Sequence, residues 1–185
     1  MSAPAPHVER LGSIPDPADA AERFADLPLL LLLDSTADHE RIGRYSFLAA
    51  DPYRIVRTKG DGDSLAAVRA ALAPFAAPPV PGLPPFQGGA AGFIGYDWGA
   101  TLERLPEPRY DDLALPDVLL GLYDWVIAWD HCERAAWIIS TGTPVEGESR
   151  ARRARERLDM VRARLAGEGG SGRETESSDA GSFSR

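Results

Sequence analysis

The sequence predicts an α+β domain, and three segments carry that prediction. Residues 124–141 (DWVIAWDHCERAAWIIST) hold two apolar stretches around a polar turn at 130–134, which is the pattern of a β-hairpin. Residues 150–167 place apolar side chains three and four positions apart, as in a helix with one buried face. The leucine run at 27–33 is too short for a typical helix, so it predicts a strand buried on both faces.

Caps and turns place the remaining elements. A helix is expected over 16–28, with Asp16 as its N-cap. A second helix is expected over 63–75, capped by Asp63 or Ser64. Its apolar stripe consists of Leu65, Val68, Leu72 and Phe75. Further strands are expected at 8–11, 44–50 and 53–60, and a stiff proline-rich connector is expected at 76–85.

The segment 86–99, FQGGAAGFIGYDWG, contains five glycines. Their spacing matches neither the G-x-G-x-x-G dinucleotide loop nor the Walker loop, and no lysine lies beside them. The segment is therefore interpreted as a strand carrying Phe93, Ile94 and Tyr96. In such a strand the glycines allow a neighbouring backbone or ring to approach closely.

Composition argues against several classes of function. The formal net charge of −8 argues against nucleic-acid binding, because phosphate contacts need a concentrated basic face. The single cysteine, Cys132, cannot form an internal disulfide, which fits a reducing compartment. The N-terminus lacks the basic and apolar regions of a signal peptide, and the leucine run is far shorter than a membrane span. We therefore expect a soluble, cytoplasmic protein that binds neither nucleic acid nor a membrane.

The residues themselves predict no catalytic group and no metal site. His131 and Cys132 are adjacent in the hairpin turn, and adjacent residues of a strand point to opposite faces, so they make a poor catalytic dyad. The arginines of 150–164 alternate with acidic residues, which is typical of a polar helix face. Three acidic residues lie near one another without the spacing of a metal motif: Asp124, Asp130 and Glu133.

One group of side chains is a candidate binding site. Ser35 ends the leucine strand, and Arg44 and Tyr45 begin the next strand. Side chains at the ends of buried strands often line pockets. A hydroxyl, a guanidinium and an aromatic ring suit the binding of a small amino acid. If the three side chains converge, we expect them to open into one cavity between the sheets.

Three segments taken together resemble one known family: LLLLLDS…GRYSFLAADP at 29–52, PFQGGAAGFIGYDWGATLERLP at 85–106 and LPDVLLGLYDWVIAWDH at 115–131. They are similar to the N-terminal domain of the chorismate-utilising component I enzymes, which include anthranilate synthase and aminodeoxychorismate synthase. The resemblance implies an N-terminal domain over residues 1–166 and a flexible linker over 167–182. It also implies that 183–185 begin a missing C-terminal catalytic domain.

The resemblance implies an α+β fold in which antiparallel sheets pack as a sandwich with flanking helices, and it makes the glycine segment a core strand. Chorismate, Mg²⁺ and the catalytic residues would belong to the C-terminal domain, so this chain would have no cofactor and no turnover alone. The full-length enzyme would aminate chorismate with ammonia from a glutamine amidotransferase subunit, on the route to p-aminobenzoate and folate. The segment GYDWG is similar to the aminodeoxychorismate branch, although Ala100 stands where the family commonly has arginine.

The resemblance also implies a tryptophan site in this domain. Ser35 would contact the amino-acid head group, and Arg44 and Tyr45 would form the pocket wall. Gly43 stands where the family usually has serine. Three other roles stay open: the feedback domain of anthranilate synthase component I, a stand-alone amino-acid-binding module, and a structural interaction domain without a ligand.

Overall fold

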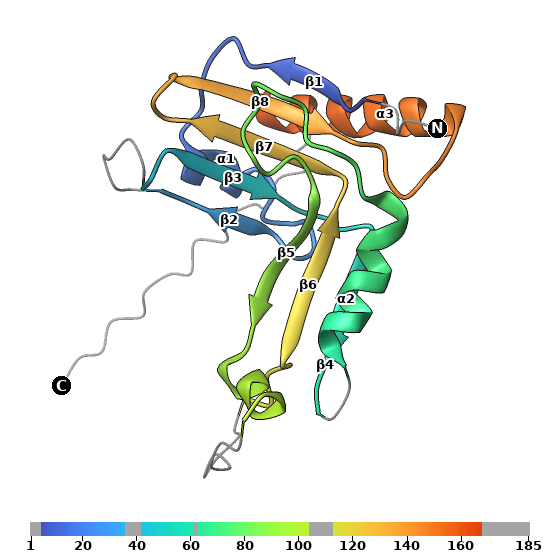
Figure 1. The fold of residues 1–185 in the computed structure, drawn as a ribbon. Coiled ribbons are helices and arrows are strands. Elements are labelled where there is room, and N and C mark those ends of the chain that lie inside the picture. The colour runs from blue at the N-terminus through green and yellow to red at the C-terminus, as the bar shows by residue number, and fades with distance from the viewer. Residues whose placement is uncertain (1–4, 36–41, 61–62, 104–112, 168–185) are drawn as a thin grey trace, which may run out of the picture.

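The computed structural model describes residues 5–35, 42–60, 63–103 and 113–167, and in this part of the chain it contains two antiparallel sheets (Figure 1). The larger sheet has five strands in the order β1-β8-β7-β3-β2. Its strands are β1 (His7–Arg10), β2 (Leu31–Leu33), β3 (Tyr45–Ala49), β7 (Trp125–Asp130) and β8 (Ala135–Ser140). The smaller sheet, in the order β4-β6-β5, consists of β4 (Arg54–Thr58), β6 (Val118–Tyr123) and β5 (Gly89–Ile94). The expected antiparallel α+β fold is confirmed.

One continuous stretch of chain joins the two sheets. Strand β6 ends at Tyr123 and β7 begins at Trp125, so Asp124 alone separates a strand of the smaller sheet from a strand of the larger one. The two strands run in clearly different directions in Figure 1. The chain therefore passes from the smaller sheet to the larger one at this single residue.

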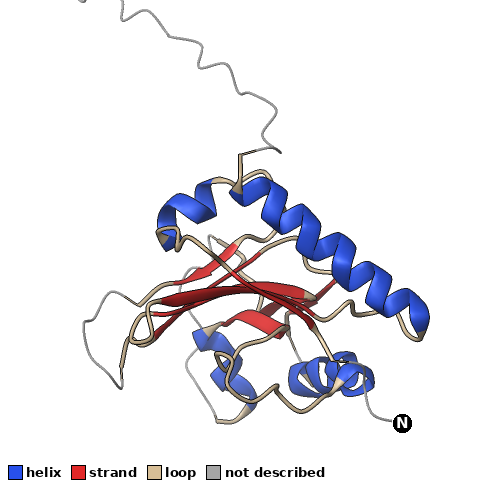
Figure 2. Ribbon diagram, turned by 90° about the horizontal axis from the view of Figure 1, so that it is seen from above, coloured by secondary structure: helices blue, strands red, loops and turns tan. Residues whose placement is uncertain are grey.

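Helices α1 (Pro17–Glu22) and α3 (Glu148–Leu165) cover one face of the five-stranded sheet (Figure 2). Helix α2 (Ser64–Leu72) packs against the smaller sheet, and it continues into the 3₁₀ turn η1 (Ala73–Phe75). A second 3₁₀ segment, η2 (Tyr96–Thr101), follows β5. The helices thus bury different sheets, and each sheet keeps its own apolar core.

Both predicted N-caps are confirmed for the first two helices. The Asp16 carboxylate accepts hydrogen bonds from the backbone of Ala18 and Asp19, and the carboxylate of Asp63, rather than Ser64, caps α2. Helix α1 is shorter than predicted. Beyond Glu22 the backbone N–H groups bond to carbonyls three residues back, which tightens the chain into turns up to Leu27.

The predicted hairpin is confirmed, and its side chains alternate between two apolar clusters, one on each face of the sheet. Trp125, Ile127 and Trp129 belong to the core under α1 and α3. Val126 and Ala128 face the other way, into a cluster that also contains Tyr123 of β6 and is packed by Ala91 of β5. The five-stranded sheet is therefore buried on both faces, by helices on one side and by the smaller sheet on the other.

Two predicted core strands lie at sheet edges instead. The leucine run forms β2, and in the described part of the chain β2 pairs only with β3. The prediction of burial on both faces was wrong, because 47% of Leu33 is exposed. The glycine segment forms β5, whose one partner among the described strands is β6, at the edge of the smaller sheet. Phe93 and Ile94 of β5 are also exposed, so the interpretation as a core strand is corrected.

The predicted close approach at the glycines is confirmed at Gly92. Its φ is +150°, and a Cβ built there would clash with the Leu119 carbonyl oxygen of β6. Gly88 is also tightly enclosed, since an added Cβ would lie 3.1 Å from the Tyr123 carbonyl oxygen. Gly92 in β5, and Gly88 directly before it, therefore let the chain lie close against β6.

Helix α3 was predicted at 150–167 and begins two residues earlier, at Glu148. Ala154, Leu158 and Val161 form its buried stripe, and Gly167 follows its end with φ +84°. Ala151, which the same three- and four-residue spacing predicts on this stripe, is exposed. The linker and the residues beyond it, predicted at 167–182 and 183–185, lie outside the described residues apart from Gly167. Among the described helices, none has the length and apolar character that a membrane crossing requires.

We expect Gly92→Ala to lower the free energy of unfolding by about 2 kcal/mol or more, because the methyl group can fit only if β5 and β6 separate. Urea denaturation followed by circular dichroism measures the change. Gly12→Ala is the matched control, since no atom lies within 4 Å of a Cβ built at Gly12. That change is expected to stay within about 0.5 kcal/mol. Equal stability of Gly92→Ala and the unaltered protein would contradict the close approach.

Candidate functional site

The structure brings Ser35 and Tyr45 together at the end of the leucine strand. Because β2 and β3 pair antiparallel, the end of the first strand lies beside the start of the second. The Ser35 hydroxyl donates a 2.7 Å hydrogen bond to the Tyr45 carbonyl oxygen. The Ser35 backbone N–H donates to the Ser46 hydroxyl at 3.0 Å. The predicted proximity is therefore present, and both Ser35 groups bond within the protein.

Arg44 is held by an acidic residue of the neighbouring strand β7. Its Nε lies 3.1 and 3.0 Å from the two Asp130 carboxylate oxygens, and its Nη2 lies 2.7 Å from Asp130 Oδ2. The guanidinium also stacks over the Tyr45 ring, with Cζ 5.0 Å from the ring centroid. Glu133 approaches the same guanidinium at 3.8 Å. Arg44 thus joins the site by a bidentate ion pair rather than by pointing into a cavity.

The Arg44–Asp130 pair is ionised at neutral pH. Burial by itself would raise the pKa of the Asp130 carboxyl, but the Arg44 hydrogen bonds and charge, together with the Glu133 backbone N–H, lower it below its usual value. The hydrogen bond to Asp130 in turn raises the pKa of the Arg44 guanidinium. A ligand carboxylate reaching Arg44 would compete with a carboxylate that is already in place.

Ser46 is the buried centre of this cluster. It is fully buried, and its Oγ lies 2.7 Å from Asp34 Oδ1 and 2.7 Å from His131 Nε2. The hydroxyl has one proton, which it donates to the Asp34 carboxylate, an acceptor only. The His131 Nε2 must then carry a hydrogen and donate it to Ser46. His131 therefore bonds to Ser46 on β3, whereas its neighbour Cys132 is exposed, as expected for the turn.

Gly43 precedes this cluster with φ at +102°. This backbone conformation is open to glycine and strained for other residues. The glycine at this position is therefore explained by the local backbone. A serine here would add a hydroxyl only at the cost of strain.

Sequence reasoning missed Asp34, Ser46, His131 and Asp130 as members of the cluster. Asp34 directly precedes Ser35 and Ser46 directly follows Tyr45. Their position in the sequence could therefore have indicated that they belong to the cluster. Asp130 and His131 come from the hairpin, 86 and 85 residues away from their partners, and only the pairing of β3 with β7 brings them here. The role of Ser35, Gly43, Arg44 and Tyr45 in binding tryptophan stays a prediction.

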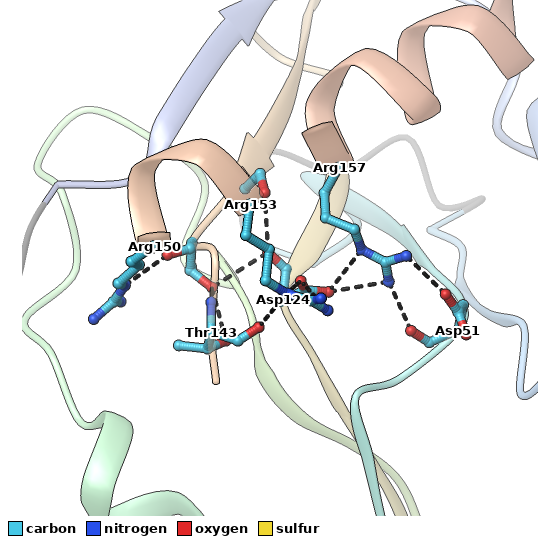
Figure 3. A network of polar contacts seen from close by, with 8 residues as sticks. Asp51, Asp124, Thr143, Arg150, Arg153 and Arg157 are labelled. Carbon is cyan, nitrogen blue, oxygen red and sulfur yellow. Dashed lines mark hydrogen bonds and ion pairs between the residues drawn. The ribbon is translucent and has the colours of Figure 1, made fainter. Parts of the chain in front are cut away.

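A second polar cluster surrounds Asp124, at the bend between β6 and β7 (Figure 3). Its side chain is completely buried. Arg153 reaches one carboxylate oxygen at 2.9 and 3.0 Å, and Arg157 reaches the other with two contacts of 3.1 Å. Arg157 also holds Asp51 through its carboxylate at 2.7 Å and its carbonyl oxygen at 2.8 Å.

This cluster corrects the interpretation of the α3 arginines as a solvated polar face. Arg153 and Arg157 are one helical turn apart and point at the sheet, where their two positive charges balance those of Asp124 and Asp51. A buried carboxylate is costly unless it is paired and hydrogen-bonded, and here both oxygens are satisfied. The cluster ties α3 to the sheet through ion pairs that hold both oxygens of Asp124.

A cavity of about 600 Å³ lies elsewhere in the molecule, between the proline-rich segment and the start of α3. None of Ser35, Gly43, Arg44 and Tyr45 lines it. Ser35, Arg44 and Tyr45 were expected to open into one cavity between the sheets, which stays a prediction. Their described polar groups bond to one another and to the hairpin. In the described ranges no group of three or more histidine, cysteine or acidic side chains gathers in a way that suits a metal ion.

Comparison with known proteins gives consistent relatives. The chain is 34% identical over 148 residues to aminodeoxychorismate synthase component 1 of Salmonella typhimurium, covering 69% of this chain and 32% of that protein. It is 34% identical over 176 residues to anthranilate synthase component 1 of Pseudomonas aeruginosa, covering 85% of this chain and 35% of that protein. A probable anthranilate synthase component 1 of Schizosaccharomyces pombe is 35% identical over 140 residues, covering 72% of this chain and 28% of that protein. No family model matches the chain.

The chain belongs to the family of aminodeoxychorismate and anthranilate synthase component 1. Among solved structures, anthranilate synthase component I from Streptococcus pneumoniae superposes with a TM-score of 0.53 at 23% identity. That match covers 83% of this chain and 37% of the solved one, and it supports the fold alone. The chain spans about a third of the length of these relatives.

We expect Asp124→Asn to lower the free energy of unfolding by about 3 kcal/mol, because two guanidinium groups lose their shared buried counter-charge. Asp159→Asn is the matched control, since Asp159 forms an exposed ion pair with Arg162 on the outer face of α3. The control is expected to cost less than about 1 kcal/mol. Chemical denaturation of both variants measures the difference. Equal losses for the two substitutions would show that the buried cluster does not hold the fold together.

Proposed function

We propose that this chain is the N-terminal, non-catalytic domain of an aminodeoxychorismate synthase component I. The observation that carries the proposal is the 34% identity to the Salmonella aminodeoxychorismate synthase, over a segment equal to 32% of that protein. The GYDWG segment, which is similar to that branch, supports the assignment within the family. In this proposal chorismate, Mg²⁺ and the acid–base residues belong to a further domain, and ammonia comes from a glutamine amidotransferase subunit.

The face of the smaller sheet opposite α2 supports packing against a further domain. Ile55 of β4, Leu119 of β6 and Phe93 of β5 lie on the same face, because Phe93 pairs with Leu119 and Ile55 pairs with the next-but-one residue, Gly121. Ile55 is 51% and Phe93 40% exposed. Apolar side chains grouped on an open sheet face are typical of surfaces that another domain covers.

We also propose that Ser35, Gly43, Arg44 and Tyr45 form one side of a tryptophan site, completed by that further domain. The cluster contains a partly exposed guanidinium stacked on an aromatic ring, and Ser35 bonded next to it. The paired state of Arg44 implies that the chain alone offers few free donors to a carboxylate. This site would act in feedback control or be bound without regulation.

A second candidate function is the N-terminal feedback domain of an anthranilate synthase component I. The observation that favours it is the 34% identity to the Pseudomonas anthranilate synthase, which extends over 85% of this chain. The two candidates differ in the product of the full-length protein, so product analysis distinguishes them.

We predict that the isolated chain neither consumes chorismate nor forms an amine product when incubated with chorismate, Mg²⁺ and ammonia. A longer protein, expressed from the gene with the codons that follow Arg185, is expected to form aminodeoxychorismate under the same conditions. Chromatography with mass detection measures both reactions, with a protein-free mixture as the control. Turnover by the chain alone, or a stop codon directly after Arg185, contradicts the proposal. Anthranilate as the product selects the second candidate.

We predict that tryptophan binds the isolated chain more weakly than about 1 mM, because its head group must displace the Arg44–Asp130 and Ser35–Tyr45 bonds. In the longer protein, Ser35→Ala is expected to weaken tryptophan binding about tenfold. Ser13→Ala, at an exposed position, is the control and is expected to leave the affinity unchanged. Isothermal titration calorimetry measures all four cases. Tight binding to the isolated chain that survives Ser35→Ala would place the site elsewhere.

A further inference from the structure

The cavity of about 600 Å³ has the size of a small-molecule site. It lies between the proline-rich connector, the start of β5, the end of β8 and the first turn of α3. Most of its lining is apolar, and the aromatic part is formed by Tyr53 and Phe75, whose rings meet edge to face at 5.8 Å. Pro78 and Pro79 add flat, rigid surfaces to the same wall. The cavity is separate from the Ser35 cluster and belongs to a different part of the fold.

Gln87 holds the proline-rich wall in place. The Val80 backbone N–H donates to Gln87 Oε1 at 2.9 Å. Gln87 Nε2 donates to the carbonyl oxygens of Val80 at 3.0 Å and Pro84 at 3.1 Å. The Gln87 side chain therefore closes the loop over residues 80–87. Several residues of this loop are prolines, whose φ is fixed. A wall ordered in this way loses little conformational freedom when a ligand binds.

Among the described residues that line the cavity, Arg150 is the one with a formal charge. Its Nε donates a 2.8 Å hydrogen bond to the Thr141 carbonyl oxygen, which leaves the two terminal nitrogens free of that bond. In Figure 3 those nitrogens point away from the Asp124 cluster. Within the described ranges no carboxylate pairs with Arg150, whereas Arg153 and Arg157 on the same side of α3 both bind Asp124. The hydroxyls of Thr141 and Thr143, 3.0 Å apart, line the same end of the cavity.

We propose that this cavity binds a small cyclic monocarboxylate, with its ring against Tyr53, Phe75 and the prolines and its carboxylate on Arg150. A carboxylate matches the two parallel N–H groups that a guanidinium presents. A single positive charge in the lining fits one negative charge and disfavours a phosphate dianion or a dicarboxylate. The apolar wall selects a ring over a short polar acid. The proposal is independent of the proposed function, because it uses only residues of this chain and requires no catalytic domain.

The test titrates benzoate into the ¹⁵N-labelled chain and follows amide shifts by nuclear magnetic resonance. Saturable shifts are expected at Gly88, Gly89 and Thr141, which line the cavity. Benzamide, of the same shape without the charge, is expected to bind at least about tenfold more weakly. Shifts that stay linear in benzoate concentration, that map away from these residues, or that benzamide reproduces at equal concentration overturn the proposal.

Two substitutions locate the binding within the cavity. Arg150→Gln is expected to weaken benzoate binding about tenfold or more, whereas Arg155→Gln, on the exposed face of α3, should leave it within about twofold. Val80→Trp fills the cavity without removing the backbone bonds to Gln87, and it is expected to abolish binding while Arg150 stays intact. A dispersed amide spectrum confirms that each variant is folded. Unchanged benzoate affinity in folded Arg150→Gln or in folded Val80→Trp rules the site out.

Discussion

The bend between the two sheets depends on a buried charge, the carboxylate of Asp124. This residue is the hinge at which one strand leaves the smaller sheet and enters the larger one, and its side chain has no contact with solvent. Burying a carboxylate is unfavourable unless each oxygen finds a charged or hydrogen-bonded partner. Arg153 and Arg157 supply both partners from α3, so the bend can form only when the helix is docked. The smaller sheet, the bend and the C-terminal helix are therefore coupled in one polar contact.

The same contact fixes α3 along its length. Ala154 and Leu158 each follow one of the two arginines and lie buried against the sheet. A shift of the helix by one turn would leave only one guanidinium on Asp124, because the two arginines are one turn apart. Apolar packing alone tolerates such slips better than hydrogen-bonded ion pairs do, because apolar packing lacks direction. Arg157 also binds Asp51, which lies in the second connection between the two sheets, from β3 to β4. The φ of Asp51 is +51°, as occurs in turns.

Local patterns were enough to predict the hairpin, the cap at Asp16, a cap at Asp63 or Ser64, the helix α3 and a close approach at the glycines of 86–99. Each depends on residues within a few positions of one another. The exposure of Leu33 was not predictable in this way, because burial of a strand depends on how many neighbours it has, and β2 has only β3. The role of Arg153 and Arg157 was equally hidden, since their partner Asp124 lies 29 and 33 residues away. In the candidate site, the contact of Ser35 with Tyr45 could be predicted because the two residues lie on consecutive strands. The pairing of Arg44 with Asp130 could not be predicted in this way, because the two residues are 86 positions apart.

The Ser35 cluster and the cavity beside Arg150 are the two candidate ligand sites, and they differ in how their arginines are paired. At the Ser35 cluster the guanidinium of Arg44 is already matched by Asp130, so a bound acid must replace an existing ion pair. At the bend, the two charges of Arg153 and Arg157 are matched by Asp124 and Asp51. Arg150 stands one turn before Arg153 but beyond reach of Asp124, and its Nε is fixed on Thr141, whose N–H and hydroxyl in turn bind the Asp124 carbonyl oxygen. The contacts that close the bend therefore also orient a positive charge toward the cavity, without a carboxylate among the described residues to match it.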